Sequence, residues 1–315
     1  HWRVDSRHFS LARYQLARGF MDMVRKGSVR GLFLSSGIGY APRTLMDKLI
    51  DTVTIIRQRH RFSGYIHLKL IPGMDHDQIR RAFSLADRVS INFETVSEAH
   101  LARIAPLKNF NRDLMGAMQS AASIRDTQYQ GRQAPSITTQ LVVGPAKESD
   151  RDLVAFAQSL YTRFGLRRVY YSAFNPIQSN TLAQTTPTSP RRQALLYQAD
   201  FLVRDYGFSH DELIYDDNAQ LPEHTDPKLA WAQAHPERFP IDLATAPYEM
   251  LLRVPGIGPR GARTLLSRRR EGAITRSAHL KGSGIALSRA LPYVLLSGRS
   301  PLPPRQLSLP FGRGW

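Results

Sequence analysis

The segment LLRVPGIGPRGARTLL (Leu251–Leu266) has the sequence of two helices joined by a tight turn. Pro255 ends the first helix, because a proline disfavours helical geometry in the residue before it. Gly256 and Gly258 permit backbone angles that other residues avoid, and they leave the turn free of side chains. Pro259 suits the first turn of the second helix, where its missing N–H is not needed. The sequence therefore predicts a helical hairpin around a glycine turn.

This turn has the features of an anion site. Backbone N–H groups at the start of the second helix converge on one point, and phosphate is the natural occupant of such a place. The segment resembles the helix-hairpin-helix of DNA repair proteins, in which a hydrophobic residue precedes P-G-I-G. The resemblance implies contacts to the nucleic-acid backbone with strong salt dependence. A purely structural αα-hairpin is the alternative. The implied DNA-contacting residues are Arg253, Gly256, Ile257, Gly258, Arg260, Gly261 and Arg263.

The basic charge of the chain is concentrated near this hairpin. The net charge is +17, and the residues from Leu251 to Trp315 contain 12 Lys/Arg and a single acid, Glu271. A field focused in this way attracts a polyanion, which predicts DNA as a partner. A solvated basic tail is the alternative.

The first 180 residues alternate short apolar segments with amphipathic helical segments, which predicts parallel strands with crossover helices. Residues 10–27 form a further predicted helix ahead of the first strand. The predicted strands are Gly31–Ser35, Tyr65–Leu70, Arg88–Glu94, Thr138–Val143 and Val169–Phe174. The clearest predicted helices are Ala41–Arg59, Asp77–Ala86, Asp150–Phe164 and Arg192–Tyr206.

Three of these strands place polar side chains on one face and apolar side chains on the other. In a barrel the outward face packs on helices, whereas the inward face can be polar at a site. The pattern favours a polar lumen over a dry sheet, with solvated strand ends as the alternative. The polar positions are His67 and Lys69, then Ser90, Asn92 and Glu94, then Thr138 and Gln140.

Most of the chain resembles a DNA modification/repair radical S-adenosylmethionine (radical SAM) family, which couples such a barrel to a C-terminal helix-hairpin-helix. The resemblance implies an α/β fold, a partial (βα) barrel without its first strand, followed by a small all-α domain. The segments that carry it, in order, are GLFLSSG, GYIHLKLIPG, ADRVSINFET, TTQLVVG, RRVYYSAFNP, DPKLAWAQAHPERFPID and YEMLLRVPGIG.

The same resemblance implies two cofactors, S-adenosylmethionine and a [4Fe–4S] cluster, whose reaction yields a radical that abstracts hydrogen from the substrate. The implied cofactor-binding residues are Ser35, Ser36, Gly37, Asn92, Glu94 and Gly144, with Glu148 shortly after Gly144. Helix capping is the alternative role for Ser35 and Ser36, and a salt bridge is the alternative role for Glu94.

The chain departs from the family in one respect, since the cluster needs three cysteines at CxxxCxxC spacing and the 315 residues contain none. The chain begins at His1 and shows no strand before its first predicted helix. We therefore expect the cluster segment to lie upstream, with true loss of the cluster as the alternative. The residues as they stand are not expected to perform radical chemistry.

The predicted organisation has four parts. A partial barrel covers residues 1–207, an irregular connector rich in Pro, Asp and His covers 208–240, and the helix-hairpin-helix domain covers 241–297. Within that domain, Gly282 and Gly284 precede a second helical run that is expected to pack as a degenerate half. A basic, proline-rich tail covers 298–315 and is expected to be extended.

The segment RQLSLPF in this tail resembles the short peptide by which bacterial repair and replication proteins bind the sliding clamp. An extended peptide would place its apolar side chains in a groove while its glutamine hydrogen-bonds at the edge. A disordered end is the alternative. The implied clamp-binding residues are Gln306, Leu307, Leu309 and Phe311.

Three functions follow from these patterns. The first is a DNA-directed radical SAM enzyme of modification or repair. The second is a non-catalytic DNA-binding adaptor that recruits partners such as the clamp or a uracil-DNA glycosylase-like protein. The third is an unrelated barrel enzyme that uses His67, Lys69 and Glu94 as acid–base groups.

Composition excludes several other classes. The lack of cysteine excludes disulfides and thiol catalysis within these residues. No apolar run approaches the roughly 20 residues that span a bilayer, so no membrane partner is expected. No secretory signal is visible at the start, and we expect a cytoplasmic, nucleoid-associated protein.

Overall fold

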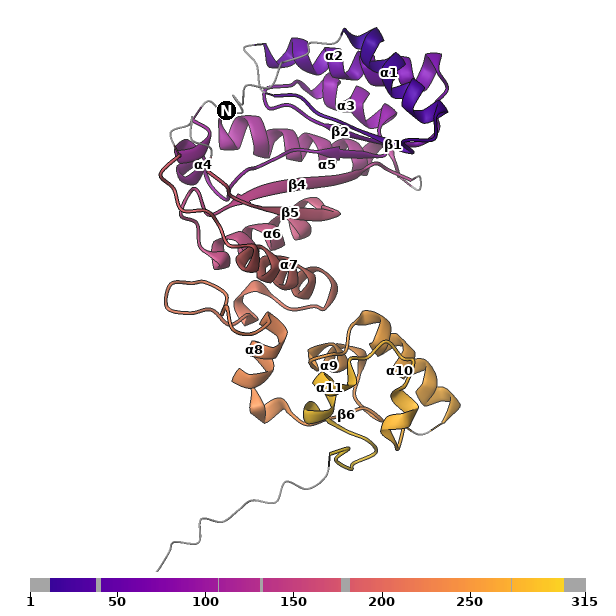
Figure 1. The fold of residues 1–315 in the computed structure, drawn as a ribbon, viewed down its shortest axis with the longest axis vertical. Coiled ribbons are helices and arrows are strands. Elements are labelled where there is room, and N and C mark those ends of the chain that lie inside the picture. Colours follow the sequence, from indigo (N-terminus) through magenta and orange to yellow (C-terminus); the bar gives the residue numbers. More distant parts are fainter. Residues whose placement is uncertain are drawn as a thin grey trace, which may run out of the picture. The chain divides into compact units, whose positions relative to one another are not determined.

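The computed structural model describes residues 12–37, 41–106, 108–130, 133–176, 182–272 and 274–302. They divide into two compact units (Figure 1). Unit 1 comprises residues 1–200 and 217–221, and unit 2 comprises residues 201–216 and 222–315. The division falls inside helix α7 (Pro190–Asp205).

Unit 1 has a mixed α/β fold built on a parallel five-stranded sheet. Its strands follow chain order, and each pairs in parallel with the next, so β1 and β5 are the sheet edges in the described residues. The five predicted strands and their parallel arrangement are confirmed. The strands are β1 (Gly31–Leu34), β2 (Tyr65–Lys69), β3 (Arg88–Ser90), β4 (Ser136–Val143) and β5 (Arg168–Ala173).

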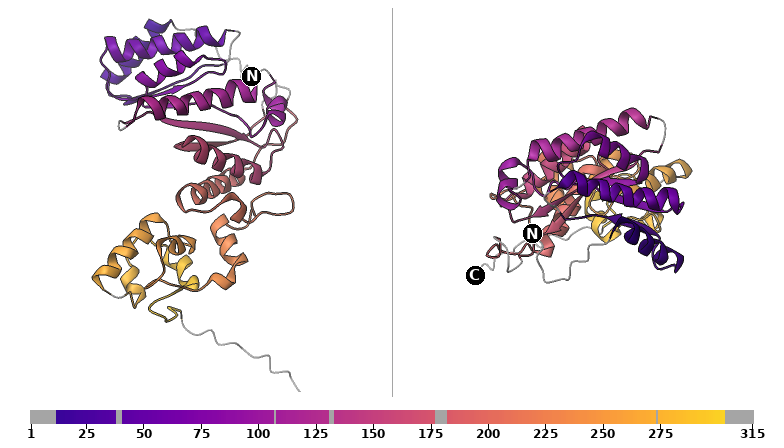
Figure 2. Two further views of the ribbon diagram at one scale, coloured as in Figure 1. Left: turned by 180° about the vertical axis from the view of Figure 1, so that it is seen from behind. Right: turned by 90° about the horizontal axis from the view of Figure 1, so that it is seen from above.

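The helices of unit 1 pack along this sheet. Figure 1 shows α1, α2 and α3 stacked beside β1 and β2, and Figure 2 shows the same group from behind. The helices are α1 (Arg13–Arg25), α2 (Pro42–Thr54), α3 (His76–Leu85), α4 (Glu98–Ile104), α5 (Gly116–Gln128), α6 (Asp150–Phe164) and α7. Two π-helical segments, η1 (Ile55–Arg59) and η2 (Phe110–Met115), extend α2 and precede α5. All the predicted helices of this region are present.

The two faces of the sheet differ as the alternation of residues predicts. Ile66, Leu68 and Val89 on one face are completely buried under the helices. On the other face Phe33 is 60% exposed and Tyr65 is 44% exposed. This second face is therefore accessible at β1 and the start of β2, whereas Ser90 and Thr138 on β3 and β4 are buried.

The strand predicted over Arg88–Glu94 is shorter in the structure. Regular pairing ends at Ser90, and Glu94 has a φ of 66° while forming an isolated bridge with Leu141. A left-handed backbone angle is incompatible with a continuous strand. The alternating sequence gives no sign of this turn, because Ile91 and Phe93 remain fully buried beyond the end of the strand.

Unit 2 differs from the predicted structure, which was an irregular connector followed by an all-α domain. Helix α8 (Pro227–Ala234) lies within the predicted connector, started by an N-cap hydrogen bond to Asp226. Two short parallel strands, β6 (Ile241–Asp242) and β7 (Val294–Leu295), close the domain, so it is not all-α. The remaining elements are η3 (His210–Glu212), η4 (Pro236–Arg238), α9 (Tyr248–Arg253), α10 (Pro259–Glu271), η5 (Ser277–Leu280), α11 (Leu287–Ala290) and η6 (Leu291–Tyr293).

The core of unit 2 is built around the predicted hairpin. Leu251, Val254, Ile257, Ala262 and Leu265 are each at most 1% exposed and belong to one apolar cluster. These positions follow helical spacing on both sides of the turn. The hairpin is therefore held rigidly by the domain that it organises.

A buried ion pair links two helices of unit 1. The carboxylate of Asp150, 1% exposed, accepts a 2.7 Å hydrogen bond from Nε of Arg192 and a 3.0 Å bond from the backbone N–H of Leu221. Removing one member of such a pair leaves a buried charge without its partner. The pair therefore joins α6 to α7, and Asp150 also holds the backbone at Leu221.

We expect Arg192→Ala to lower the free energy of unfolding by about 3 kcal/mol. The matched control is Arg25→Ala, which breaks an exposed pair with Asp22 and should cost less than about 1 kcal/mol. Urea unfolding followed by circular dichroism measures both. Equal losses in the two variants would show that the Asp150 pair has no special role.

Candidate functional site

The turn between α9 and α10 requires glycine at its first position. Gly256 has a φ of +84°, and a Cβ added there would lie 2.6 Å from the carbonyl oxygen of Ala286. Ile257 follows with its side chain fully packed in the core. Gly258 then caps α10 without any side-chain hydrogen bond. A glycine turn between two helices is thus present, and Ala286 and Tyr206 pack against the Cα atoms of Gly256 and Gly258.

A second glycine turn packs directly against the first. Gly282 and Gly284 both have positive φ, at +70° and +79°. The N–H of Ala286 donates a 2.9 Å hydrogen bond to the carbonyl of Gly256. A Cβ on Gly261 would lie 2.9 Å from Cγ1 of Ile285. The expected second half therefore does pack against the hairpin, although only the four-residue helix α11 follows it.

The start of α10 offers backbone donors. In the described part of the chain, no acceptor is found for the N–H groups of Gly258, Arg260 and Gly261. The positive end of a 13-residue helix dipole adds to their effect. The first turn of α10 can therefore receive an anion without displacing an internal partner.

Two of the implied DNA-contacting arginines lie beside these donors, and one does not. Arg260 and Arg263 are exposed on the first two turns of α10. Arg253 is engaged within unit 2, where it forms a 2.9 Å ion pair with Glu212 and lies 3.8 Å from the centre of the Phe208 ring. We therefore leave Arg253 out of the proposed phosphate contacts.

The arginines further along α10 mostly bind backbone carbonyls. Arg269 donates from Nε to the carbonyl of Leu243 and from Nη1 to that of Ala246, each at 2.6 Å. Arg268 donates to the carbonyl of Lys281 at 3.0 Å. Arg270, in contrast, is exposed. Of the three consecutive arginines, Arg268 and Arg269 thus stabilise the fold, whereas Arg270 faces solvent.

A buried lysine supports the hairpin turn from α8. Nζ of Lys228 donates a 2.5 Å hydrogen bond to the carbonyl of Ile257 and lies 4.7 Å from the centre of the Tyr206 ring. The pKa of Lys228 is lowered from 10.5 to about 7, mainly by burial; Arg289 and Arg253 also lower it, and Asp226 opposes them. The segment around Lys228 carried no recognisable signal of this role in the sequence.

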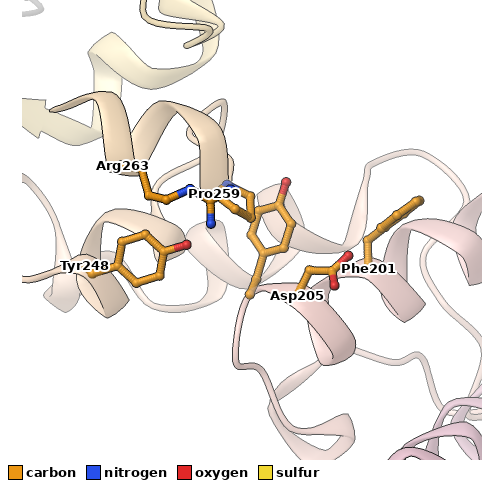
Figure 3. A pocket seen from close by; sticks show the side chains of 6 residues that line it. Phe201, Asp205, Tyr248, Pro259 and Arg263 are labelled. Carbon is orange, nitrogen blue, oxygen red and sulfur yellow. The ribbon is translucent and has the colours of Figure 1, made fainter. Parts of the chain in front are cut away.

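A pocket opens beside the start of α10. Its volume is about 430 Å³. Figure 3 shows Tyr248 and Arg263 reaching into this space from α9 and α10, with Phe201 and Asp205 on the α7 side. The six lining residues are Phe201, Asp205, Tyr206, Tyr248, Pro259 and Arg263. The sequence pointed only to Arg263, because the other five come from three separate segments or have no distinctive motif.

The implied cofactor-binding residues of unit 1 are largely satisfied by internal partners. Glu94 forms a 3.0 Å ion pair with Lys108, which is the alternative role expected for it. Asn92 is 8% exposed and donates to Gln140 at 3.5 Å. Ser35, Ser36 and Gly37 follow β1 in an irregular segment, and Oγ of Ser36 donates to the carbonyl of Gly37.

Gly144 has no room for a ligand against its Cα. Its N–H donates to the carboxylate of Glu148, and the hydroxyl of Thr188 occupies the space that a Cβ would fill. The geometry after β4 therefore shows no open cradle for the adenosyl group of S-adenosylmethionine. The cysteine-free chain likewise provides no thiolate for a [4Fe–4S] cluster. No group of three His, Cys, Asp or Glu residues suited to a metal occurs in the described ranges.

The polar face of the sheet carries an unusual histidine. Burial lowers the pKa of His67 from 6.5 to about 4, with smaller contributions from Arg88 and Lys69. Nε2 of His67 is buried and has no hydrogen-bond partner in the described residues. At neutral pH this ring is therefore uncharged, which makes it a weak general base.

The implied clamp-binding residues, from Gln306 to Phe311, lie outside the described residues. Among the helices that the structure describes, none is both long and apolar enough to cross a bilayer.

Comparisons with known proteins leave the family open. No family model matches the chain, and no curated protein matches it. Among solved structures, the fold is similar to the crystal structure of HydG, a maturase of the [FeFe]-hydrogenase, with a TM-score of 0.47 and 10% sequence identity. The similarity covers 64% of this chain and 44% of HydG, so the chain spans less than half of that protein. A likeness at this level carries no functional argument.

The pKa of His67 has a measurable consequence. Because the folded chain resists protonating this ring, its contribution to stability is present above pH 6.5 and is lost as the pH falls towards 4. In an NMR titration the His67 ring should titrate with a midpoint of about 4. A His67 midpoint at or above 6 would contradict this environment.

The lowered pKa of Lys228 predicts a change in the stability of unit 2 above pH 7, whereas that of His67 acts at acidic pH. Below pH 7 the amine is charged in both states, and folding carries the full cost of burying that charge. Between pH 7 and 10.5 only the unfolded chain keeps the proton, so the stability of unit 2 should rise with pH, by at most about 1.4 kcal/mol per pH unit.

Unfolding followed by the fluorescence of the buried Trp231 measures this slope. Lys228→Met should remove most of the rise in unfolding free energy between pH 7 and 9. Lys281→Met, which changes an exposed lysine, should leave it unchanged. An equal slope in wild type and Lys228→Met would refute the assignment.

Proposed function

We propose that unit 2 binds the sugar–phosphate backbone of a nucleic acid through the hairpin turn, with DNA as the partner that the sequence resemblance implies. The observation that carries the proposal is the unoccupied donor set at the start of α10, next to the exposed side chains of Arg260 and Arg263. Backbone N–H groups at a helix start and flanking arginines are the groups that proteins use for phosphate.

The surrounding charge supports the same partner. Lys281 is exposed on the second glycine turn, which packs against the first. Glu271 lies at the far end of α10 and is the single acid from Leu251 onward. Such a surface adds long-range attraction to the local contacts. Because its donors are backbone amides and arginines, it should select phosphate rather than base sequence.

The radical SAM activity remains an implication of the resemblance. It needs three thiolates that these 315 residues do not supply, and Gly144 is closed by Thr188. We therefore derive no radical step for this chain. The function that we assign to it is that of a nucleic-acid-binding protein, which corresponds to the adaptor hypothesis.

Fluorescence anisotropy with a labelled DNA duplex at several salt concentrations tests this function. Wild-type protein should bind more weakly as salt rises, in a linear relation between log affinity and log salt. The double variant Arg260→Ala/Arg263→Ala should bind more weakly and lower the steepness of that relation by about one for each arginine.

The matched control is Arg270→Ala/Arg276→Ala, which removes two exposed arginines away from the turn. Arg270 lies about 15 Å along α10 from Arg260, given the rise of a helix. The control should bind nearly as tightly as wild type. Equal weakening in both double variants would show general charge attraction without a hairpin site.

A further inference from the structure

The pocket beside the hairpin has the composition of a site for a flat, polar ring. Phe201, Tyr206 and Tyr248 supply three aromatic side chains to its wall. Its volume of about 430 Å³ falls in the range of roughly 300–1,000 Å³ for small-ligand sites. Phe201 is 39% exposed, which is unusual for a phenylalanine. Arg204 lies 5.0 Å from the centre of the Phe201 ring and Nζ of Lys228 lies 4.7 Å from that of Tyr206. Rings that line a cavity favour an aromatic ligand, because two π systems can stack or meet edge to face.

The same pocket offers hydrogen-bonding groups of both kinds. The Tyr206 and Tyr248 hydroxyls can donate or accept, and Arg263 only donates. The carboxylate of Asp205 accepts two bonds from Arg204, at 3.2 Å on Oδ1 and 2.9 Å on Oδ2, and each oxygen keeps a further lone pair. A purely apolar ligand would leave these groups unpaired, whereas a nucleobase edge carries donors and acceptors that match them.

The pocket shares residues with the proposed phosphate site at the start of α10. Pro259 and Arg263 lie on the first turns of α10 and also line the pocket. The hydroxyl of Tyr206 lies 2.9 Å from where a Cβ on Gly258 would be, so it packs against the bare Cα of the helix cap. A nucleotide whose phosphate sits at the start of α10 would thus have its base within reach of these rings.

We propose that this pocket holds an unpaired nucleobase of the DNA that the hairpin grips. The inference rests on the proposed backbone-binding function and adds a preference to it. Unit 2 favours DNA in which one base has left the stack over DNA that is fully paired. Stacking against the pocket rings provides the extra affinity, and it tolerates any base because every base has a π face.

Three labelled duplexes test this preference with the full chain. One is fully paired, one has a single bulged adenine, and one carries a stable abasic analogue at the bulge. We expect the bulged adenine to bind about fivefold to 100-fold more tightly than the other two. The abasic duplex separates recognition of the base from recognition of bent or flexible DNA.

Variants on α9 locate the effect. Tyr248→Leu should abolish the preference for the bulged adenine while leaving affinity for the fully paired duplex unchanged, and Tyr248→Phe should keep most of the preference because it keeps the ring. The control is Met250→Ala, which changes a 44% exposed residue that does not line the pocket. It lies about 200° around the helix from Tyr248. Circular dichroism confirms that each variant is folded.

The outcomes distinguish the two proposals. If wild type binds none of the duplexes, the backbone-binding function fails, and the base pocket fails with it. If it binds all three equally in a salt-dependent way, the function stands and the base pocket is overturned. A preference for the bulged adenine that survives in a folded Tyr248→Leu variant also overturns it.

Discussion

The absence of a side chain at Gly256 is the constraint on which unit 2 depends. The carbonyl of Ala286 occupies the space where a Cβ would stand, and the N–H of the same residue bonds back to Gly256. This contact brings the two glycine turns together. It also sets the direction in which α10 leaves the turn, and therefore where its N–H groups and first arginines are presented.

Some arginines near the hairpin stabilise the fold and others stay exposed, and the tertiary partners of each arginine determine its role. Arg253 pairs with Glu212, and Arg269 donates to two backbone carbonyls, so both stabilise the fold. Arg260 and Arg263 are exposed and form no ion pair with a described residue. A basic sequence around a hairpin is thus only partly a binding surface, because much of its charge closes the domain around the hairpin.

The sequence predicted the strands of unit 1 well because they are short apolar runs, and β2 and β5 alternate buried and less buried residues, which is a local pattern. It also predicted the turn at Gly256, since glycine and proline act locally. The isolated bridge at Glu94, the engagement of Arg253 and helix α8 were not predicted, because each depends on tertiary context. The pocket was missed for the same reason: Phe201, Tyr206 and Tyr248 come from segments that only the fold brings together.

The two glycine turns are unequal, since α10 has 13 residues and α11 has four. A short helix has few aligned peptide dipoles, so its start attracts a phosphate less strongly. The two strands of a duplex run in opposite directions, and unequal turns would hold one of them more firmly than the other. If unit 2 binds a duplex as proposed, it would hold one strand in a fixed 5′-to-3′ direction, and anything attached to the domain would be oriented relative to that strand.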